Sequence, residues 1–216
     1  VVRSVERGKT PEGISLVNEV NVLHPADLYL LAVTDEVISK VAGTLPEEAF
    51  VVHTAGGVAL EVLNQNRAGV FYPLQTFSEG RNMDFSKLPI GLECKQSTDL
   101  PLLEKLVQAL GARSFHMNSK QREHLHLAAV LVNNFTNHLF AEAASICSQN
   151  YLPFELLNPL IQETVNKLEY LSPKAAQTGP AIRHDQKTIE KHLTLIEERS
   201  LQEIYKVVTL AIQKKQ

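Results

Sequence analysis

The sequence predicts an α/β domain with a parallel sheet covered on two sides over residues 1–118, followed by an all-helical domain over residues 119–216. Two observations lead to this fold class. Up to Met117, short apolar runs rich in β-branched and aromatic residues alternate with amphipathic helical patterns, as in a parallel sheet with crossover helices. From Ser119 to Gln149 there is neither Pro nor Gly, and apolar residues occur almost all around the helix.

Five strands are expected in the first domain, because five short runs have strand length and strand composition. They are LYLLAV ending at Val33, FVVHTA at 50–55, VFYP at 70–73, IGLEC at 90–94 and RSFHM at 113–117. Helices are expected at 35–45 and 99–110, where apolar residues recur three and four apart. Thr98 or Asp99 can cap the second of these helices, and Gly111 follows its end.

The helical domain is expected to be built on the long helix 119–149. A further helical pattern begins at Pro153, and Pro159 is expected to bend or restart it. Two last helices are expected at about 186–197 and 201–213, with Asp185 and Ser200 as their N-caps. Because the long helix is apolar on more sides than these short helices can cover, a homodimer through the helical domain is expected.

Composition excludes several classes of protein. The chain has 216 residues, of which 44% are hydrophobic and 21% charged, enough to build real cores. No apolar run approaches the ~20 residues that a bilayer requires, and the first residues lack the features of a signal peptide, so a soluble cytoplasmic protein is expected, with no membrane contact. A net charge of -3 disfavours nucleic-acid binding and leaves small molecules or protein surfaces as partners. Cys94 and Cys147 are expected to be reduced.

Five segments, taken together and in order, carry a family resemblance. They are HTAGGVALEVL at 53–63, GVFYPLQTFS at 69–78, LHLAAVLVNNFTNHL at 125–139, FELLNPLIQETV at 154–165 and SPKAAQTGPAIRHD at 172–185. From about Ala26 to Leu210 the chain resembles the bacterial Rossmann-like proteins that carry domain of unknown function 2520. That family is similar to the pyrroline-carboxylate reductases, the 3-hydroxyacid dehydrogenases and ketopantoate reductase. The resemblance implies an NAD(P)-dependent oxidoreductase scaffold with a nucleotide-binding domain and a helical domain that often dimerises.

The chain departs from the family pattern at its start. That pattern opens with a strand, a glycine-rich turn of the GxGxxG or GxGN type and a helix that holds the pyrophosphate. Gly8 and Gly13 do not have this spacing, so the first βαβ unit of ~30 residues is either not represented in this chain or lost in this member. Around the second strand of the family pattern, Arg3, Ser4 and Arg7 would meet a 2′-phosphate; the plainer interpretation is a frayed basic segment.

Four residues are expected to contact the cofactor, NADP or NAD. In a doubly wound sheet, ligands lie beyond the carboxyl ends of the strands. Val33 is the last residue of the first predicted strand, and Thr34 follows it. Thr54 and Gly56 lie at the end of the second predicted strand. Glycine there lets the backbone approach a flat nicotinamide or ribose. The alternative, preferred for Gly57, is a tight turn from strand to helix.

Four other residues are expected to bind a small-molecule substrate. Gln75 and Thr76 lie in YPLQTF, which aligns with the Pro-containing loop that borders the substrate in the related reductases, and they can orient a carbonyl or carboxylate. Tyr72 is expected to pack. Arg183 lies at the start of a predicted helix and can bind an anion through two parallel hydrogen bonds. Asp185 is the expected N-cap of that helix and a candidate partner of Arg183.

The expected catalytic residues are His126, Asn133 and Asn137. Their spacing of seven and four puts them within ~20° of one line on an α-helix. The 3-hydroxyacid dehydrogenases carry a catalytic Lys one turn before an Asn on the corresponding helix, but Ala129 and Val130 occupy those positions here. His126 is therefore the expected proton donor or acceptor, with a structural histidine as the alternative. No metal site is expected, because the histidines lack metal-ligand spacing.

The sequence thus predicts an NAD(P)-dependent oxidoreductase that transfers a hydride to or from a small carbonyl, imine or hydroxy acid in an interdomain cleft. The alternative is a non-catalytic nucleotide-binding or scaffold protein that retains the dehydrogenase fold. The missing glycine turn and the absent lysine favour the scaffold. The polar stripe on the long helix favours the enzyme.

Overall fold

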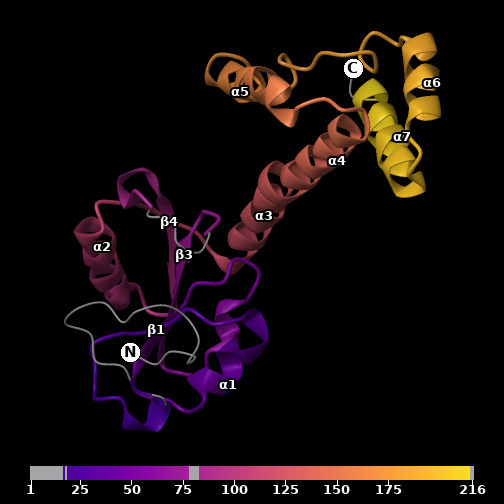
Figure 1. Ribbon diagram of the computed structural model, residues 1–216. Helices are drawn as coiled ribbons and strands as arrows, with labels where there is room; N and C mark the ends of the chain where they lie inside the picture. The colour runs from indigo at the N-terminus through magenta and orange to yellow at the C-terminus, as the bar shows by residue number, and fades with distance from the viewer. Residues whose placement is uncertain (1–16, 18, 78–82, 215–216) are drawn as a thin grey trace. The chain divides into compact units, whose positions relative to one another are not determined.

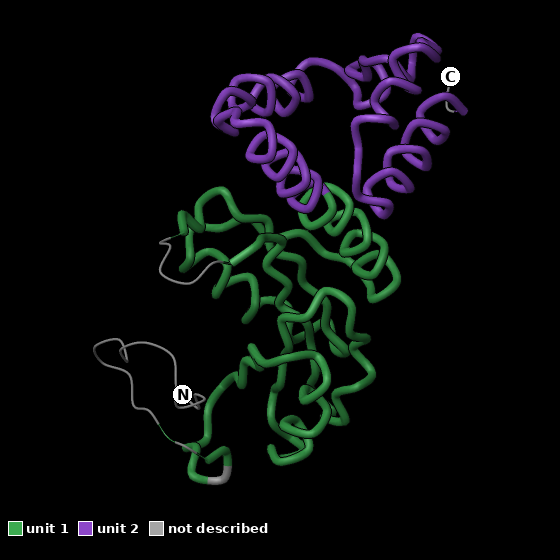
Figure 2. The backbone as a smooth tube through the Cα atoms, turned by 45° about the vertical axis from the view of Figure 1, so that its right-hand side comes forward, with its two compact units in different colours: residues 1–135 green, residues 136–216 purple. Residues whose placement is uncertain are grey.

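The computed structural model describes residues 17, 19–77 and 83–214, and it divides into two compact units, Val1–Phe135 and Thr136–Gln216 (Figure 2). The basic residues Arg3, Ser4 and Arg7 lie outside the described residues. The boundary between the units falls inside the predicted long helix rather than at residue 118, where that helix begins. In the described residues, no helix combines the length and apolar character needed to cross a membrane.

A sheet forms the centre of the first unit (Figure 1). It has five strands in the order β1-β2-β3-β4-β5. The strands are β1 Tyr29–Leu31, β2 Phe50–His53, β3 Arg67–Pro73, β4 Pro89–Cys94 and β5 Arg113–His116. All five predicted strands are confirmed. β1, β2 and β3 run parallel, and Leu31 and Val70 flank His53 on its two neighbouring strands.

The sheet is not wholly parallel, and this part of the prediction is wrong. β4 runs antiparallel to β3, so that Glu93 lies opposite Val70. A parallel neighbour requires a crossover connection, usually a helix, whereas an antiparallel neighbour requires only a reversal of the chain. Among the described residues between β3 and β4, the only helical turn is η4, Phe85–Lys87. β4 and β5 are parallel again, because helix α2 connects them.

Helices on both faces cover the sheet, as predicted. Two core clusters result, because successive residues of a strand point to opposite faces: Val51 packs with Ile38 of α1 (Ile38–Ala42), and Val52 packs with Leu103 of α2 (Leu100–Ala109). Gly111 ends α2 in the left-handed conformation, at φ 69°. Shorter helical turns are η1 Val20–Val22, η2 Asp35–Val37, η3 Leu60–Val62 and η5 Ser97–Asp99.

The long helix predicted over 119–149 is interrupted. It consists of α3 (Ser119–Ala129), a π-helical segment η6 (Val130–Phe135) and α4 (Thr136–Gln149). In a π-helix each hydrogen bond spans one residue more than in an α-helix, so the turn is wider. Side-chain directions before and after η6 therefore do not follow a single α-helical period.

The second unit is helical throughout, as expected. After α4 come η7 Phe154–Leu157, α5 Asn158–Asn166, η8 Lys167–Glu169, α6 Gln186–Leu195 and α7 Arg199–Lys214. Pro159 stands in the first turn of α5, which confirms that it restarts the helix. Cys94 of the first unit and Cys147 of the second are both free, as expected.

Of the three predicted N-caps, the one at Asp185 is confirmed and the one at Ser200 is wrong, while Asp99 stands before α2 without a side-chain capping hydrogen bond. Asp185 caps α6, because its carboxylate accepts a hydrogen bond of 3.1 Å from the Thr188 amide. Ser200 lies inside α7, and the Glu198 carboxylate accepts from the amides of Ser200 at 3.2 Å and Leu201 at 2.7 Å. The longer glutamate side chain, two positions before Ser200, reaches two free amides of the first turn.

Candidate functional site

His126 lies at the carboxyl end of β3. It stands in the last turn of α3, and its Nδ1 is 3.2 Å from the hydroxyl of Tyr72, the penultimate residue of β3. The two rings meet edge to face, with centroids 6.2 Å apart and an interplanar angle of 72°. Tyr72 is 7% exposed, and burial raises the pKa of its phenol, so it remains protonated near neutral pH.

The Gly56 position, just after β2, faces the same imidazole. A Cβ atom on Gly56 would lie 2.5 Å from Nδ1 of His126 and 2.9 Å from the Tyr72 ring, closer than atoms can approach. Glycine is needed here because the chain's own His126 and Tyr72 occupy the space. The sequence had suggested another reason, the approach of a cofactor, because the spacing of motifs does not show which side chain fills a glycine's empty position.

A buried ion pair fixes α3 on the sheet. Arg122, one turn before His126, is 0% exposed and forms an ion pair with Glu93 of β4, while also donating to the Val58 carbonyl. Ser119 adds two bonds to the same carboxylate, from its amide at 2.7 Å and from its hydroxyl at 2.9 Å. Since Arg122 and His126 are four residues apart on one helix, this anchor determines where the imidazole stands.

A second histidine, His53 at the carboxyl end of β2, is fully buried. Its Nδ1 accepts a hydrogen bond of 3.2 Å from the Ala55 amide, so the neutral ring carries its proton on Nε2. Burial, followed by the positive charge of Arg122, lowers the pKa of His53 to about 4. His53 is therefore neutral near pH 7 and unsuited to proton transfer.

The residues expected to contact the cofactor lie where β1 and β2 end. Val33 is 40% exposed, and Thr34 is exposed. Thr54 bonds instead to the neighbouring strand: its amide and its hydroxyl donate to the Leu31 carbonyl at 3.3 Å and 3.5 Å. Thr54 thus ties β2 to β1.

Gln75 and Thr76 follow the end of β3 and are both exposed. The Gln75 side-chain carbonyl accepts a 3.0 Å hydrogen bond from the Thr76 amide. Both residues therefore stand at the edge of the sheet where Tyr72 and His126 meet.

The other two expected catalytic residues are exposed and lie beyond His126 along the chain. Asn133 belongs to the π-helical segment, and Asn137 belongs to α4 of the second unit. Their alignment with His126 assumed 100° per residue throughout, and this premise is wrong because η6 widens the helix. Their catalytic roles remain predictions.

Arg183 and Asp185 lie in a turn before α6 in the second unit. Both carboxylate oxygens of Asp185 accept from Thr188, which lowers the pKa of Asp185, and Arg183 is exposed. His184 between them adopts the left-handed conformation at φ 52°, which is uncommon for a residue with a side chain. The backbone of this turn is therefore held in a strained form.

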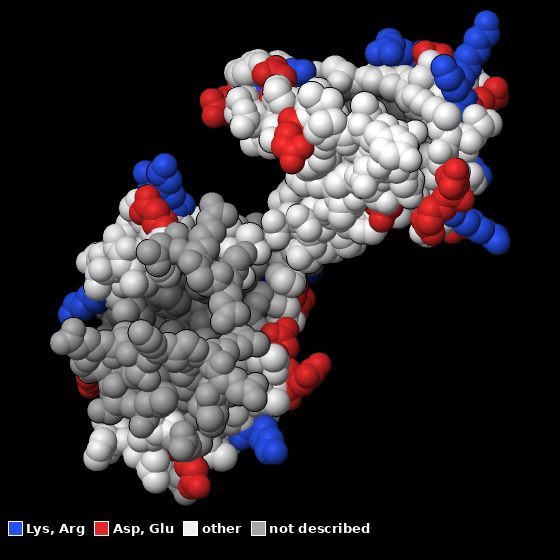
Figure 3. Space-filling view, viewed as in Figure 1, with Lys and Arg blue, Asp and Glu red and all other residues white. Residues whose placement is uncertain are grey.

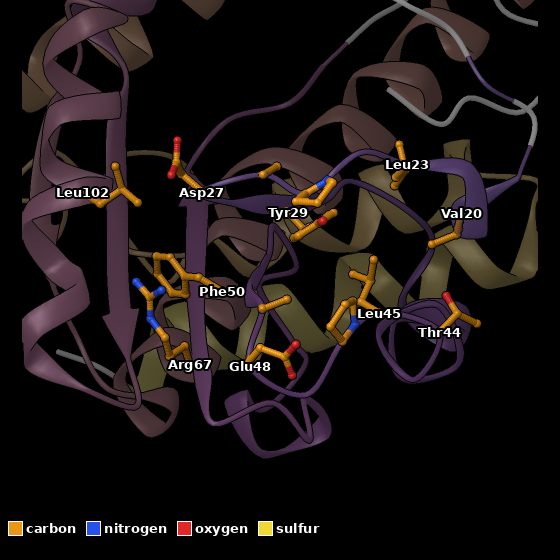
Figure 4. Close-up of a pocket in the computed structure, with 14 residues that line it drawn as sticks. Val20, Leu23, Asp27, Tyr29, Thr44, Leu45, Glu48, Phe50, Arg67 and Leu102 are labelled. Atoms are coloured by element: carbon orange, nitrogen blue, oxygen red, sulfur yellow. The ribbon is translucent and has the colours of Figure 1, made fainter.

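A cavity of about 630 Å³ opens at the opposite, amino end of β1–β3 (Figure 4). The carboxylates of Asp27 and Glu48 line this cavity. Arg67 also lines it and forms an ion pair with Asp99 at 2.6 Å. These charges do not favour the phosphates of a dinucleotide. Among the described residues, no three His, Cys, Asp or Glu side chains converge as a metal site requires.

Comparison with known proteins gives a family match and several similar structures. The family model described as domain of unknown function (DUF2520) matches residues 88–212, which confirms the resemblance seen in the motifs. A structure from Bacteroides fragilis, provisionally named an NADP oxidoreductase, is 38% identical, with a TM-score of 0.84, over 92% of this chain and 80% of that chain. No curated protein matches.

Two more distant structures share the fold alone. Pyrroline carboxylate reductase from Plasmodium falciparum, with NADP bound, is 12% identical, with a TM-score of 0.55, over 88% of this chain and 75% of that chain. A semialdehyde dehydrogenase NAD-binding protein from Cupriavidus necator, in complex with calcium and NAD, is 17% identical, with a TM-score of 0.57, over 94% and 83% of the two chains. The Rossmann-like fold predicted from the sequence is confirmed.

Proposed function

Because the chain belongs to the family described as domain of unknown function 2520, whose fold is that of NAD- and NADP-binding oxidoreductases, we propose that it is an NAD(P)-dependent oxidoreductase. The proposed reaction transfers a hydride to or from a small carbonyl, imine or hydroxy acid. The observation that carries this proposal is the position of His126. The imidazole of His126, a group that can exchange a proton, lies at the carboxyl ends of parallel strands, where doubly wound sheets bind their ligands.

We propose that the nicotinamide half of the cofactor lies at the end of β1. Val33 offers an exposed apolar side chain and Thr34 an exposed hydroxyl at the end of β1. A glycine-rich turn of the GxGxxG type is not found among the described residues. The dinucleotide, when bound, supplies the hydride. In this proposal, His126 exchanges the proton, while Gln75 and Thr76 orient the substrate.

Titration of the full chain with NADPH and with NADH, followed by nucleotide fluorescence, tests the proposal. We expect saturable binding of at least one nucleotide, and its oxidation when 1-pyrroline-5-carboxylate or another small imine or keto acid is added. Binding without turnover on any such probe would favour the non-catalytic alternative. Absence of binding to either nucleotide would contradict the proposal.

Arg183 is proposed to hold the anionic group of the substrate. We expect Arg183→Ala to raise KM by ten- to a hundredfold, because losing a charge-assisted bond costs about 1.5–3 kcal/mol. Arg183→Lys should restore part of this loss, since a point charge cannot reproduce the planar fork. Dinucleotide affinity and melting temperature are measured on the same variants. A lowered melting temperature with unchanged KM would show that Arg183 is structural.

We also propose a homodimer through the helical domain. Large apolar side chains along η6 and α4 are exposed: Leu131 52%, Val132 74%, Phe135 57%, Leu139 42%. Figure 3 shows uncharged side chains over the visible face of α4, with charged groups around the edges of the second unit. An apolar patch of this kind is typical of an interface.

Light scattering is therefore expected to give twice the 24.0 kDa chain mass, about 48 kDa. Val132→Glu should shift the mass toward the monomer, because it places a charge within the patch. Lys187→Glu, an exposed change on α6, serves as the control. A monomer mass for the wild type at micromolar concentration would contradict the proposal.

A further inference from the structure

The imidazole of His126 is paired with the hydroxyl of Tyr72, and the two nitrogens of this imidazole have different surroundings. Nδ1 faces inward: it is 3.2 Å from the Tyr72 hydroxyl and close to Gly56, which is buried. Nε2 lies on the side of Gly57, which is exposed, 4.0 Å from where a Gly57 Cβ would stand. Nε2 is therefore the nitrogen that a ligand at the strand ends can reach.

We propose that Tyr72 is a positioning residue for the proposed hydride transfer: its oxygen accepts a hydrogen bond from Nδ1–H of His126 and so leaves Nε2 free for proton exchange. This inference rests on the proposed function. Which ring nitrogen of a histidine keeps its proton is set by the bond that the other nitrogen makes or lacks. A phenol can accept as well as donate. Nδ1 lies close to Gly56 and within hydrogen-bond distance of the Tyr72 hydroxyl, so the hydroxyl is the acceptor available to a proton on Nδ1.

The proton balance follows from this arrangement. In the reducing direction the imidazolium carries protons on both nitrogens. The reduced dinucleotide, when bound, would supply the hydride to the carbon of the substrate's C=O or C=N bond and leave oxidised, while the oxygen or nitrogen of that bond takes the proton from Nε2. His126 is left neutral, with its remaining proton on Nδ1 and bonded to Tyr72. A proton from solvent restores the imidazolium at Nε2, and the oxidising direction reverses these steps.

The rest of the site supports this role for Tyr72. The buried Arg122–Glu93 pair fixes α3, so the backbone of His126 is held where its imidazole reaches the Tyr72 hydroxyl. Gly56 admits the ring against the strand end, and a larger residue would push it off Tyr72. His53, the other histidine at this edge, is bonded to the Ala55 amide and takes no part.

Nitrogen-15 NMR of the histidine side chains in the full-length protein tests the proposal without requiring turnover. We expect neutral His126, assigned by its loss in His126→Gln, to be the Nδ1–H tautomer. Tyr72→Phe keeps the packed ring but removes the acceptor, so the proton should redistribute toward Nε2. Tyr29→Phe is the matched control, because it removes a hydroxyl that bonds the His24 carbonyl at 3.2 Å near the other end of β1. An Nε2–H tautomer in the wild type would overturn the proposal.

A kinetic measurement with NADPH and 1-pyrroline-5-carboxylate, or whichever small imine or keto acid is turned over, provides the second arm. Tyr72→Phe is expected to lower kcat on the order of tenfold, with KM and dinucleotide affinity within about twofold of wild type. An unchanged kcat would overturn the positioning role. If no probe is turned over by the wild type, the proposed function fails, whereas the tautomer measurement still decides whether Tyr72 holds the proton on Nδ1.

Discussion

Replacing Arg122 by alanine is expected to lower the free energy of unfolding by about 3–5 kcal/mol, because it leaves a carboxylate without its partner in a low-dielectric environment. Arg122 is 0% exposed, and the Glu93 side chain is 12% exposed. The variant also removes the donor to the Val58 carbonyl. At the junction between α3 and the sheet, the Glu93 carboxylate would then lose its charged partner and keep only its bonds from Ser119, and the Val58 carbonyl would lose the Arg122 donor.

Urea denaturation of the wild type and the variant measures this effect. Arg199→Ala is the matched control, because Arg199 pairs with Glu203 on the surface of α7 at 3.4 Å, with the arginine 91% exposed. Exposed pairs of this kind contribute at most about 1 kcal/mol. A loss below about 1 kcal/mol in Arg122→Ala would show that water reaches the Glu93 carboxylate.

A double-mutant cycle separates the ion pair from the other contacts of Arg122. The variant carrying both Arg122→Ala and Glu93→Ala is expected to lose less stability than the sum of the two single variants, because no unpaired charge remains. Additive losses would contradict a direct interaction between these two side chains.

Arg122 also shows where sequence reasoning reaches its limit. A charged residue on a helix normally faces solvent, and its partner Glu93 is 29 residues away along the chain. Neither residue belongs to a local motif. Their burial depends on α3 packing across the sheet, which periodicity does not reveal. His126, by contrast, could be singled out, because a polar residue on an otherwise apolar stripe requires a partner or a ligand.

The fold itself was predicted where local pattern decides structure. All five strands and the cap at Asp185 are visible in the sequence, because strand composition and capping chemistry are local properties. The antiparallel direction of β4 is not visible in the sequence, because it depends on how the chain returns after β3. The π-helical segment Val130–Phe135 was missed because its residues continue the apolar helical pattern on both sides.

Acidification is expected to destabilise the protein through His53. Its pKa is lowered to about 4 in the folded protein, against 6.5 in the unfolded chain, because burial and Arg122 disfavour the charged ring. Below pH 6.5 the unfolded chain therefore binds more protons at this residue than the folded protein does. The contribution of His53 is constant above about pH 6.5, and the free energy of unfolding falls as the pH drops from 6.5 to about 4, by about 3 kcal/mol in total.

His53→Asn isolates this effect. The asparagine side-chain oxygen can accept from the Ala55 amide in place of Nδ1, yet it does not titrate. The wild type and the variant are compared by urea denaturation at several values between pH 7.5 and 4.5, and the difference in their unfolding free energies should shift steadily in favour of the variant below about pH 6.5. His116→Asn, which removes an exposed imidazole, controls for the loss of a histidine. If the difference between wild type and His53→Asn does not change over this range, the ring accepts its proton as readily in the folded protein as in the unfolded chain. In that case Arg122 and the surrounding core do not hold it neutral.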